Sequence, residues 1–362
     1  MKANKLALVG LLVGAGVASI GTLAQDSSVM HKMMPPKQAS PANAATGELS
    51  SLSSATEWLN SPPLTAAGLR GKVVLIDVWT YTCINWLRTV PYVRMWAQKY
   101  KDQGLVVIGV HAPEFPFERN PDNVRRAVQA MGLAYPIAVD NDFAIWRAFR
   151  NAAWPALFFV DHQGRLRHQH FGEGKYEESE RFIQKLLAEA GATGVGNELI
   201  SVDGVGSEAA ADWASLRSPE TYLGYERAER FAGVPTRDKS HVYARSARLG
   251  LNQWSLAGDW TVQKGAAASN KADGRIAYRF HARDLHLVMG PAARGASVRF
   301  RVLIDGMPPG AAHGTDVDDQ GVGTVTEQRL YQLIRQPKPI ADRLFEIEFL
   351  DPGVEAYAFT FG

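Results

Sequence analysis

The sequence has 362 residues, of which 46% are hydrophobic, and its 39 basic and 37 acidic residues give a formal net charge of +2. This length exceeds the size at which a single hydrophobic core usually stops growing, so we expect two domains. The near balance of charge provides no strong one-sided field, which argues against a nucleic-acid partner. The single cysteine, Cys83, excludes an intramolecular disulfide, so any redox chemistry must be intermolecular.

The first 24 residues place two lysines before an apolar run that contains no charge. This pattern predicts an export signal cleaved before Gln25, with a retained N-terminal membrane anchor as the alternative. Either outcome places the folded part outside the cytoplasm, in the periplasm if the source is a bacterium. Residues 25–50 are polar with two adjacent prolines, so we expect a disordered linker. Its "MHKMM" run is a weak pattern for metal, and we expect no metal or cofactor.

Residues 51–191 alternate short apolar runs with segments of helical spacing. The apolar runs predict five strands, and the intervening patterns predict four helices. Strands in this order, with helices between them, predict a mixed sheet covered by helices on both faces, which is the order of a thioredoxin-like α/β domain. The strands are expected at 72–79, 105–111, 135–140, 156–161 and 166–172, and the helices at 85–100, 121–132, 143–150 and 176–191.

The pattern changes after a boundary rich in Gly, Ala and Ser at residues 192–215, which predicts a linker. Residues 216–362 hold seven short, mostly alternating runs divided by Gly- and Pro-containing turns. Such runs predict an all-β sandwich of the jelly-roll kind.

Cys83 lies in "WTYTCINWLR", directly after a strand that ends at Trp79 and before a predicted helix. A helix N-terminus favours thiolate over thiol, so we expect Cys83 to be more reactive than a free cysteine. Pro91 should kink the helix. "AAWPALFFVD" places Trp154 and Pro155 just before a strand, where a cis-proline turn is expected.

Several spaced motifs resemble one family over roughly residues 55–362: "WTYTCINWLRTVPY", "VIGVHAPEFPFE", "WPALFFVD", "GEGKYEESERFIQKLL", "ETYLGYER", "RLYQLIR" and "EAYAFTFG". The family is the extracytoplasmic part of DipZ-type proteins of cytochrome c biogenesis. The resemblance implies a thioredoxin-like domain followed by a jelly roll similar to carbohydrate-binding modules. It implies thiol-disulfide exchange as the activity, whereas the family's membrane-embedded electron-transfer portion has no counterpart here.

The chain departs from that family at Trp86, where the resemblance implies a second cysteine. That cysteine, one helical turn after the first, would resolve a mixed disulfide within the protein. Three readings remain. The first is single-cysteine exchange with protein or small-molecule disulfides, resolved by an external thiol. The second is a redox-inactive binding or scaffold module. The third is a one-cysteine peroxidase, since Thr80 to Cys83 matches a Thr-x-x-Cys core, although Ile76 stands where that pattern has proline.

We assign supporting roles around Cys83 to residues on both sides of it. Trp79 and Tyr81 are expected to line the walls of the site. Trp86 is expected to shield the Cys83 sulfur or to act as a platform for a substrate. Pro155 is expected to contact the bound partner through its backbone. Arg88, farther along the helix, is a candidate for favouring thiolate.

The loop "HAPEFPFE" should also approach Cys83, because ligand sites gather at the carboxyl ends of parallel strands. Glu114 is the preferred candidate for a proton relay, with His111 and Glu118 as alternatives. The bland interpretation is that the two glutamates solvate a loop.

Two further patterns occur in the second domain. Residues Asp316 to Glu327 overlay on a calcium loop, but their flanks read as strands, so a Gly/Asp turn is the preferred interpretation. A carbohydrate or protein ligand of the sandwich rests on the resemblance alone, because aromatic residues in a sandwich are usually core. Those residues are Trp254, Trp260, Tyr278 and Tyr331.

Overall fold

The computed structural model describes residues 47–246 and 248–362, which belong to one compact unit, Lys32–Gly362. The predicted export signal, the "MHKMM" run and nearly all of the predicted linker 25–50 lie outside the described residues. Ordered structure begins before residue 51, because the 3₁₀ helix η1 (Glu48–Ser54) buries Leu49 and Leu52. Within the described ranges no helix is long and apolar enough to cross a membrane.

The first domain is built on a six-stranded sheet with the order β1-β4-β3-β2-β5-β6. Strands β2, β3 and β4 are parallel, while β1, β5 and β6 pair antiparallel to their neighbours. All five strands expected from the apolar runs are present, and β1 is an additional edge strand. The bounds are β1 Glu57–Leu59, β2 Val73–Trp79, β3 Leu105–His111, β4 Ile137–Val139, β5 Ala156–Val160 and β6 Leu166–Phe171.

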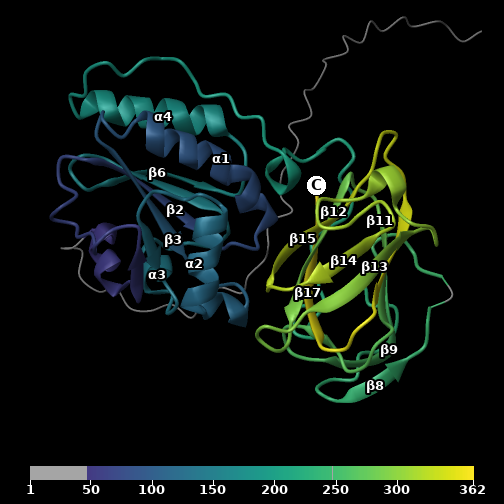
Figure 1. Ribbon diagram of the computed structural model, residues 1–362. Helices are drawn as coiled ribbons and strands as arrows, with labels where there is room; N and C mark the ends of the chain where they lie inside the picture. The colour runs from purple at the N-terminus through teal and green to yellow at the C-terminus, as the bar shows by residue number, and fades with distance from the viewer. Residues whose placement is uncertain (1–46, 247) are drawn as a thin grey trace, which may run out of the picture. The chain divides into compact units, whose positions relative to one another are not determined.

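Alternate residues of β2 point into two different cores, as the period of a strand requires. Val73, Leu75 and Trp79 belong to a cluster that also contains residues of the helices α1, α2 and α4. The intervening Val74 and Ile76 belong to a cluster with η1 and α3. Helices therefore cover both faces of the sheet, as predicted (Figure 1). The helices are α1 Ile84–Lys99, α2 Pro121–Ala130, α3 Ala144–Ala148 and α4 Tyr176–Glu189, with the 3₁₀ helix η2 at Pro116–Arg119.

The second domain, called the β domain below, is one continuous antiparallel sheet with the order β14-β13-β16-β11-β9-β10-β17-β12-β15. Strands β7 and β8 pair with β17 and β9. The seven predicted runs all form strands, and four short strands (β7, β8, β10 and β14) were not predicted. The bounds are β7 Thr221–Tyr222, β8 Ser240–Tyr243, β9 Trp254–Val262, β10 Ala267–Ser269, β11 Gly274–Phe280, β12 Asp284–Pro291, β13 Val298–Ile304, β14 Val322–Val325, β15 Arg329–Arg335, β16 Arg343–Phe349 and β17 Val354–Phe361.

The two halves of this sheet face each other across a common apolar core. The ring centroids of Phe345 in β16 and Phe359 in β17 lie 5.8 Å apart, and those of Tyr278 in β11 and Phe361 in β17 lie 5.2 Å apart. Neither β16 nor β11 is hydrogen-bonded to β17. Contacts of this kind join the inner faces of a sandwich. The predicted fold class, an α/β domain followed by an all-β domain, is confirmed, whereas the jelly-roll connectivity stays a prediction.

Residues 192–215 hold more structure than the predicted linker. They include the 3₁₀ helix η3 (Gly206–Glu208) and contact both domains. Glu208 pairs with Arg94 of α1 at 2.6 Å, and the Gly206 carbonyl accepts a hydrogen bond from Arg335 of β15 at 2.9 Å. The segment is therefore fixed between the domains by charged hydrogen bonds, which composition alone does not reveal.

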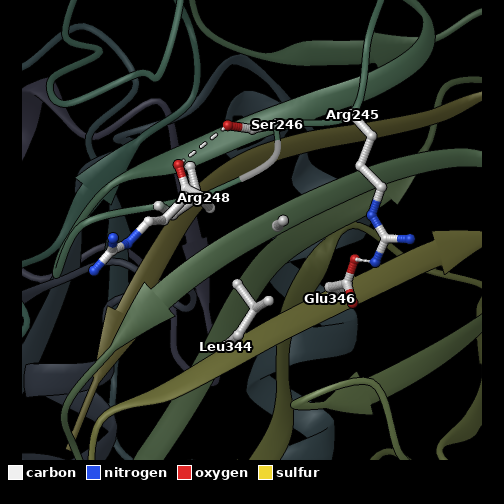
Figure 2. A pocket seen from close by; sticks show the side chains of 7 residues that line it. Arg245, Ser246, Arg248, Leu344 and Glu346 are labelled. Carbon is white, nitrogen blue, oxygen red and sulfur yellow. Dashed lines mark hydrogen bonds and ion pairs between the residues drawn. The ribbon is translucent and has the colours of Figure 1, made fainter.

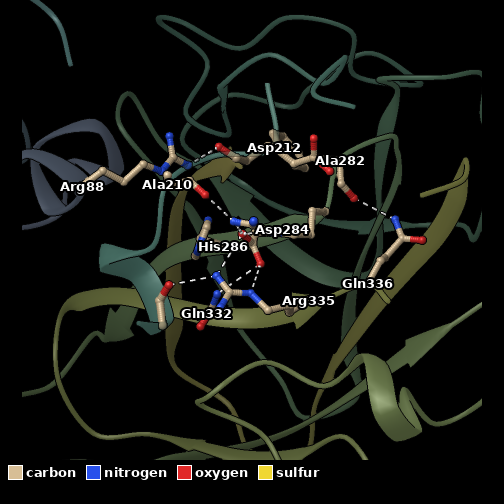
Figure 3. A network of polar contacts seen from close by, with 12 residues as sticks. Arg88, Ala210, Asp212, Ala282, Asp284, His286, Gln332, Arg335 and Gln336 are labelled. Atoms are coloured by element: carbon tan, nitrogen blue, oxygen red, sulfur yellow. Dashed lines mark hydrogen bonds and ion pairs between the residues drawn. The ribbon is translucent and has the colours of Figure 1, made fainter. Parts of the chain in front are cut away.

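A buried carboxylate, Asp284, organises the polar contacts of this region (Figure 3). Arg335 donates to Asp284 Oδ1 at 2.7 Å, and Arg283 donates to Oδ2 at 2.6 Å. Burial alone would raise the pKa of Asp284, but the hydrogen bonds from Arg335 and Arg283 outweigh it and lower the pKa. Two guanidinium groups thus compensate this buried charge.

Candidate functional site around Cys83

Cys83 occupies the N-cap of α1, one short turn after β2 ends at Trp79. Its side chain is half-buried, and Sγ donates a weak hydrogen bond to the Trp154 carbonyl at 3.8 Å. The Trp154-Pro155 peptide bond is cis, as predicted. The only thiol of the chain therefore lies where a strand, a helix N-terminus and a proline turn meet.

The electrostatic surroundings of Cys83 oppose the expected thiolate. Burial raises the pKa of the thiol well above its usual value, and the charges of Glu114 and Glu220 raise it further. Hydrogen bonds from the backbone N–H groups of Trp86 and Asn85 lower it, but by less. The prediction that a helix N-terminus would make Cys83 unusually acidic is therefore wrong, because desolvation and two carboxyl groups dominate.

Trp86 lies in the core and not at the surface. Its side chain is 0% exposed and stacks on Trp79 with a centroid separation of 4.3 Å. The indole Nε1–H donates to Asp77 Oδ2 at 3.0 Å. An indole buried in this way presents no surface to a substrate, so the expected platform at Trp86 is absent from this conformation. The residue instead fills the space one helical turn after Cys83.

Asp77, beneath Trp86, was not identified from the sequence. It lies in the middle of β2 and is fully buried, and within the described residues its side-chain hydrogen bonds come from two neutral donors, Trp86 and the Tyr135 hydroxyl. Burial raises its pKa to about 7, and these two hydrogen bonds offset only part of the effect. The available signal was a single acidic residue inside the otherwise apolar run "VVLIDVW".

Glu118 connects the turn before Cys83 to the loop after β3. Its Oε1 accepts a hydrogen bond from Thr82 at 2.7 Å, and its Oε2 accepts from the backbone N–H groups of Glu114 and Phe115 at 2.7 and 2.8 Å. Burial raises the pKa of Glu118 to about 7 despite these donors. The bland interpretation, in which Glu118 solvates a loop, does not fit a fully buried side chain. Glu118 therefore holds the turn before Cys83 against the loop after β3 from inside the protein.

Glu114 contacts the β domain through its side chain. Tyr222 Oη donates to Glu114 Oε1 at 2.5 Å, and Arg227 Nη1 donates to the same oxygen at 2.9 Å. Tyr222 Oη also lies 3.1 Å from Glu220 Oε1. The expectation that Glu114 lies near Cys83 agrees with its electrostatic effect on the thiol. The three β-domain residues were not predicted, although all belong to the quoted motif "ETYLGYER".

Trp79, Tyr81 and His111 form an aromatic group under the site. His111 lies between the two rings, 4.9 Å from Trp79 and 5.8 Å from Tyr81. Trp79 is fully buried and Tyr81 is 5% exposed, so both support the site from below. Burial lowers the pKa of His111 to about 3, which leaves it neutral and unsuited to proton relay near neutral pH.

Arg88 does not favour the thiolate. Its guanidinium is buried, pairs with Glu173 at 2.8 Å, and donates to the Phe361 carbonyl at 2.8 Å. Figure 3 shows Arg88 beside the network around Asp284. Arg88 therefore joins α1 to the last strand of the β domain.

The calcium pattern at Asp316 to Glu327 forms a turn that leads into a strand. Both carboxylate oxygens of Asp316 are engaged, Oδ1 by Arg329 at 2.6 Å and Oδ2 by the Gln332 N–H at 2.7 Å. Asp318 accepts from the Val322 N–H at 2.7 Å, where β14 begins. These contacts are those of the preferred Gly/Asp turn.

The β domain carries a surface pocket of about 270 Å³ on its outer face (Figure 2). Arg245 pairs with Glu346 at one side, and Leu344 and Ala277 belong to the lining. No aromatic ring lines this pocket, and the four aromatic side chains considered for sugar stacking are at most 1% exposed. They are core residues, so they provide no stacking surface.

Comparison with known proteins agrees with this architecture. The Redoxin family model matches residues 50–186, and the family model described as the thioredoxin like C-terminal domain matches residues 218–362. Thiol-disulfide oxidoreductase YkuV of Bacillus subtilis (strain 168) is 31% identical over 132 residues, which cover 36% of this chain and 88% of YkuV. A solved thioredoxin-like protein in the oxidised form is 31% identical, covers 40% of this chain and 93% of its own, and has a TM-score of 0.35. The chain belongs to the thioredoxin-like thiol-disulfide oxidoreductase family.

A more specific similarity extends across most of the chain. Protein DipZ of Mycobacterium tuberculosis (strain CDC 1551 / Oshkosh) is 39% identical over 266 residues, as is that of Mycobacterium bovis (strain ATCC BAA-935 / AF2122/97). The match covers 72% of this chain but only 37% of DipZ. The chain is thus a DipZ-type thioredoxin-like protein that spans just over a third of the length of these relatives.

Proposed function

We propose that this protein carries out thiol-disulfide exchange through Cys83 alone, with an external thiol resolving the mixed disulfide. The observation that carries the proposal is the arrangement of α1. Cys83 is only partly buried at the helix N-cap, whereas the position one turn later holds a fully buried tryptophan bonded to Asp77. The single thiol is thus only partly covered at the start of the helix, and the chain supplies no second thiol.

The exchange balances as two displacements. Cys83 loses its thiol proton and attacks one sulfur of a partner disulfide, which forms the Cys83 mixed disulfide and releases the other sulfur as a thiol. An external thiol then attacks the mixed disulfide, takes the partner sulfur and restores the Cys83 thiol. Suitable partners are protein or small-molecule disulfides. The raised pKa of Cys83 makes the first step slow unless a neighbouring group removes the proton.

The same raised pKa supports one alternative, a redox-inactive binding or scaffold module. A thiol held protonated by burial and two carboxyl groups is a poor nucleophile. The raised pKa of Cys83 also argues against the one-cysteine peroxidase, because attack on peroxide requires the thiolate.

Incubation with 2-hydroxyethyl disulfide followed by intact-protein mass spectrometry tests the proposal. We expect one adduct on the native folded protein and none on Cys83→Ser. If Cys83 forms the adduct only after unfolding in urea, the thiol is inaccessible and the binding-module alternative replaces exchange.

We also propose that the chain is exported, on the basis of the lysines and uncharged apolar run of residues 1–24. N-terminal sequencing of protein from the extracytoplasmic fraction tests this. A mature chain starting at Gln25 supports cleavage, and an intact N-terminus in the membrane fraction supports an anchor. Recovery only from the cytoplasm would overturn export.

A further inference from the structure

A row of aromatic side chains, called the aromatic row below, begins at the thiol and continues to α3. Cys83 Sγ lies 3.8 Å from the Trp154 carbonyl oxygen. The ring centroids of Trp154 and Trp146 lie 4.5 Å apart, and those of Trp146 and Phe143 lie 5.9 Å apart. Rings at these separations are in contact. A partner chain that brings its disulfide to Cys83 therefore has the aromatic row beside it.

The aromatic row is partly exposed and is held in place by the core. Phe143 and Trp154 are partly exposed, although both also pack against the core cluster that contains Trp146 and Phe149. The Trp154 indole donates a hydrogen bond to the Ala112 carbonyl at 3.0 Å. Phe143 has a φ of 56°, a left-handed conformation that is costly for a bulky side chain and is typical of ligand-binding segments. Rings fixed in this way lose little conformational freedom when a partner binds.

Exposed arginines surround the aromatic row. The Arg119 guanidinium carbon lies 5.7 Å from the Phe143 ring centroid, and Arg119 donates to the Asn141 carbonyl at 2.8 Å. Arg147 belongs to α3, and Arg150 follows α3 by two residues. All three arginines are exposed with the β domain in place. The aromatic row and these three arginines are together called the α3 surface.

The acidic residues near the α3 surface do not cancel its charge. Asp140 is buried and accepts hydrogen bonds from backbone N–H groups of α3 at 2.7 Å. Asp142 is the one exposed carboxylate between residues 140 and 154. On the other side of the thiol, Glu114 is paired with Arg227 at 2.9 Å. Three arginines against two aspartates leave the α3 surface positive even with Asp140 ionised, and a positive surface favours an acidic partner.

We propose that the α3 surface docks the partner of Cys83, and that this partner is an acidic protein segment next to a disulfide; this rests on the exchange activity proposed above. The aromatic row can contact at most about three residues of an extended segment, because such a segment rises about 3.3 Å per residue. The acidic side chains of the partner therefore lie within a few residues of its cysteine. Small neutral disulfides react without using the α3 surface.

Peptide disulfides with a neutral leaving group test this selectivity on the native protein. Each peptide carries a cysteine linked to 2-thiopyridine, beside a phenylalanine and either two glutamates or two lysines. Cys83 Sγ bonds to the peptide sulfur, the bond to 2-thiopyridine breaks, and the released 2-thiopyridone carries away the Cys83 proton. At an ionic strength of about 0.02 M we expect the glutamate peptide to react at least about tenfold faster, and this ratio to fall below about threefold at about 0.5 M. A ratio near one at low ionic strength would overturn the proposal.

Removal of two arginines locates the selectivity. In Arg147→Gln combined with Arg150→Gln, we expect the glutamate-to-lysine rate ratio to fall at least about threefold. Arg181→Gln combined with Lys185→Gln removes the same charge from exposed positions of α4 and is the matched control. The control should keep the ratio within about twofold of the native value. Equal falls in both double variants would overturn the proposal, because selectivity would then follow net charge alone, and so would an unchanged ratio in the first.

A small neutral reagent with the same leaving group, 2-hydroxyethyl 2-pyridyl disulfide, separates this proposal from the exchange activity. The native protein and both double variants should react with it at rates within about twofold of one another, because it has no charge for the arginines to attract. Failure of the native protein to react would overturn exchange itself. Reaction with this reagent but equal rates for the two peptides would leave exchange intact and overturn docking at the α3 surface.

Discussion

Two buried aspartates, one in the first domain and one in the β domain, show that the two domains compensate a buried carboxyl group differently. Asp77 beneath the thiol site is 0% exposed, and Asp284 in the β domain is 2% exposed. Asp77 accepts hydrogen bonds from the neutral donors Trp86 and Tyr135, and burial raises its pKa to about 7. Asp284 receives charged donors, and its pKa falls. The two side chains are almost equally buried, so the charge of their hydrogen-bond donors decides whether the pKa rises or falls.

This difference separates a structural charge from groups suited to chemistry. Around Asp284, arginines compensate the carboxylate and join the β domain to residues 206–210. Near Cys83, the carboxyl groups of Asp77, Glu118 and Glu220 have pKa values raised to about 7 or 8, chiefly by burial. Perturbation of this kind is characteristic of functional sites.

The largest expected effect follows from replacing Trp86, the indole donor to Asp77, with cysteine. Trp86→Cys places a second thiol one helical turn after Cys83, which allows resolution within the protein. We expect the mixed disulfide formed on Cys83 with 2-hydroxyethyl disulfide to be discharged at least about 100-fold faster than in the native protein, because the second displacement becomes intramolecular.

Trp86→Ala is the matched control, because it leaves a similar cavity without a thiol. Both variants should lose roughly 3–5 kcal/mol of unfolding free energy, as large-to-small core substitutions do. The assay therefore requires a temperature at which both are folded. Equal rates of discharge of the mixed disulfide in the two variants would show that position 86 is not aligned with Cys83 for resolution.

A smaller effect compares the two aspartates directly. Asp284→Asn leaves Arg335 and Arg283 without their carboxylate, and we expect a loss of about 3 kcal/mol in urea unfolding at pH 7. Asp77→Asn keeps an acceptor for the Trp86 indole and removes a carboxyl group that is costly to ionise. We expect no loss above about 1 kcal/mol. Similar losses in both variants would contradict the distinction between compensated and uncompensated charge.

The smallest effect in a single comparison is the change of stability over one pH unit. Because the pKa of Asp77 is raised from 3.8 to about 7, the folded state binds more protons than the unfolded state between these values. Its contribution to stability is therefore present at low pH and falls as pH rises from about 4 to 7. We expect the unfolding free energy of Asp77→Asn to fall less steeply across this window, by up to about 1.4 kcal/mol per pH unit. Identical slopes would show that Asp77 is ionised at its usual pKa.

Much of the fold could be predicted because the signals are local. The apolar run of β2, interrupted only by Asp77, and the alternating runs of β11 and β13 identify their strands directly. The missed strands β7, β8, β10 and β14 have at most four residues, too few to show a period. They form because neighbouring strands supply hydrogen bonds, and no window of sequence contains that information.

The features of the candidate site also differ in whether adjacent residues predict them. The position of Cys83 at a helix N-terminus and the cis Trp154-Pro155 bond follow from adjacent residues. The raised pKa of Cys83 does not, because it depends first on burial within the folded chain and then on the charges of Glu114 and Glu220, which lie far away in the chain. Local reasoning therefore located the thiol but gave the wrong sign for its pKa.

Discharge of the Cys83 mixed disulfide is the most direct test of the account. The adduct formed with 2-hydroxyethyl disulfide is freed of reagent by gel filtration, and its loss is followed by intact mass at several glutathione concentrations. We predict an adduct that persists without added thiol and is lost at a rate proportional to glutathione concentration. Rapid loss without added thiol, at a rate that glutathione does not change, would contradict resolution by an external thiol.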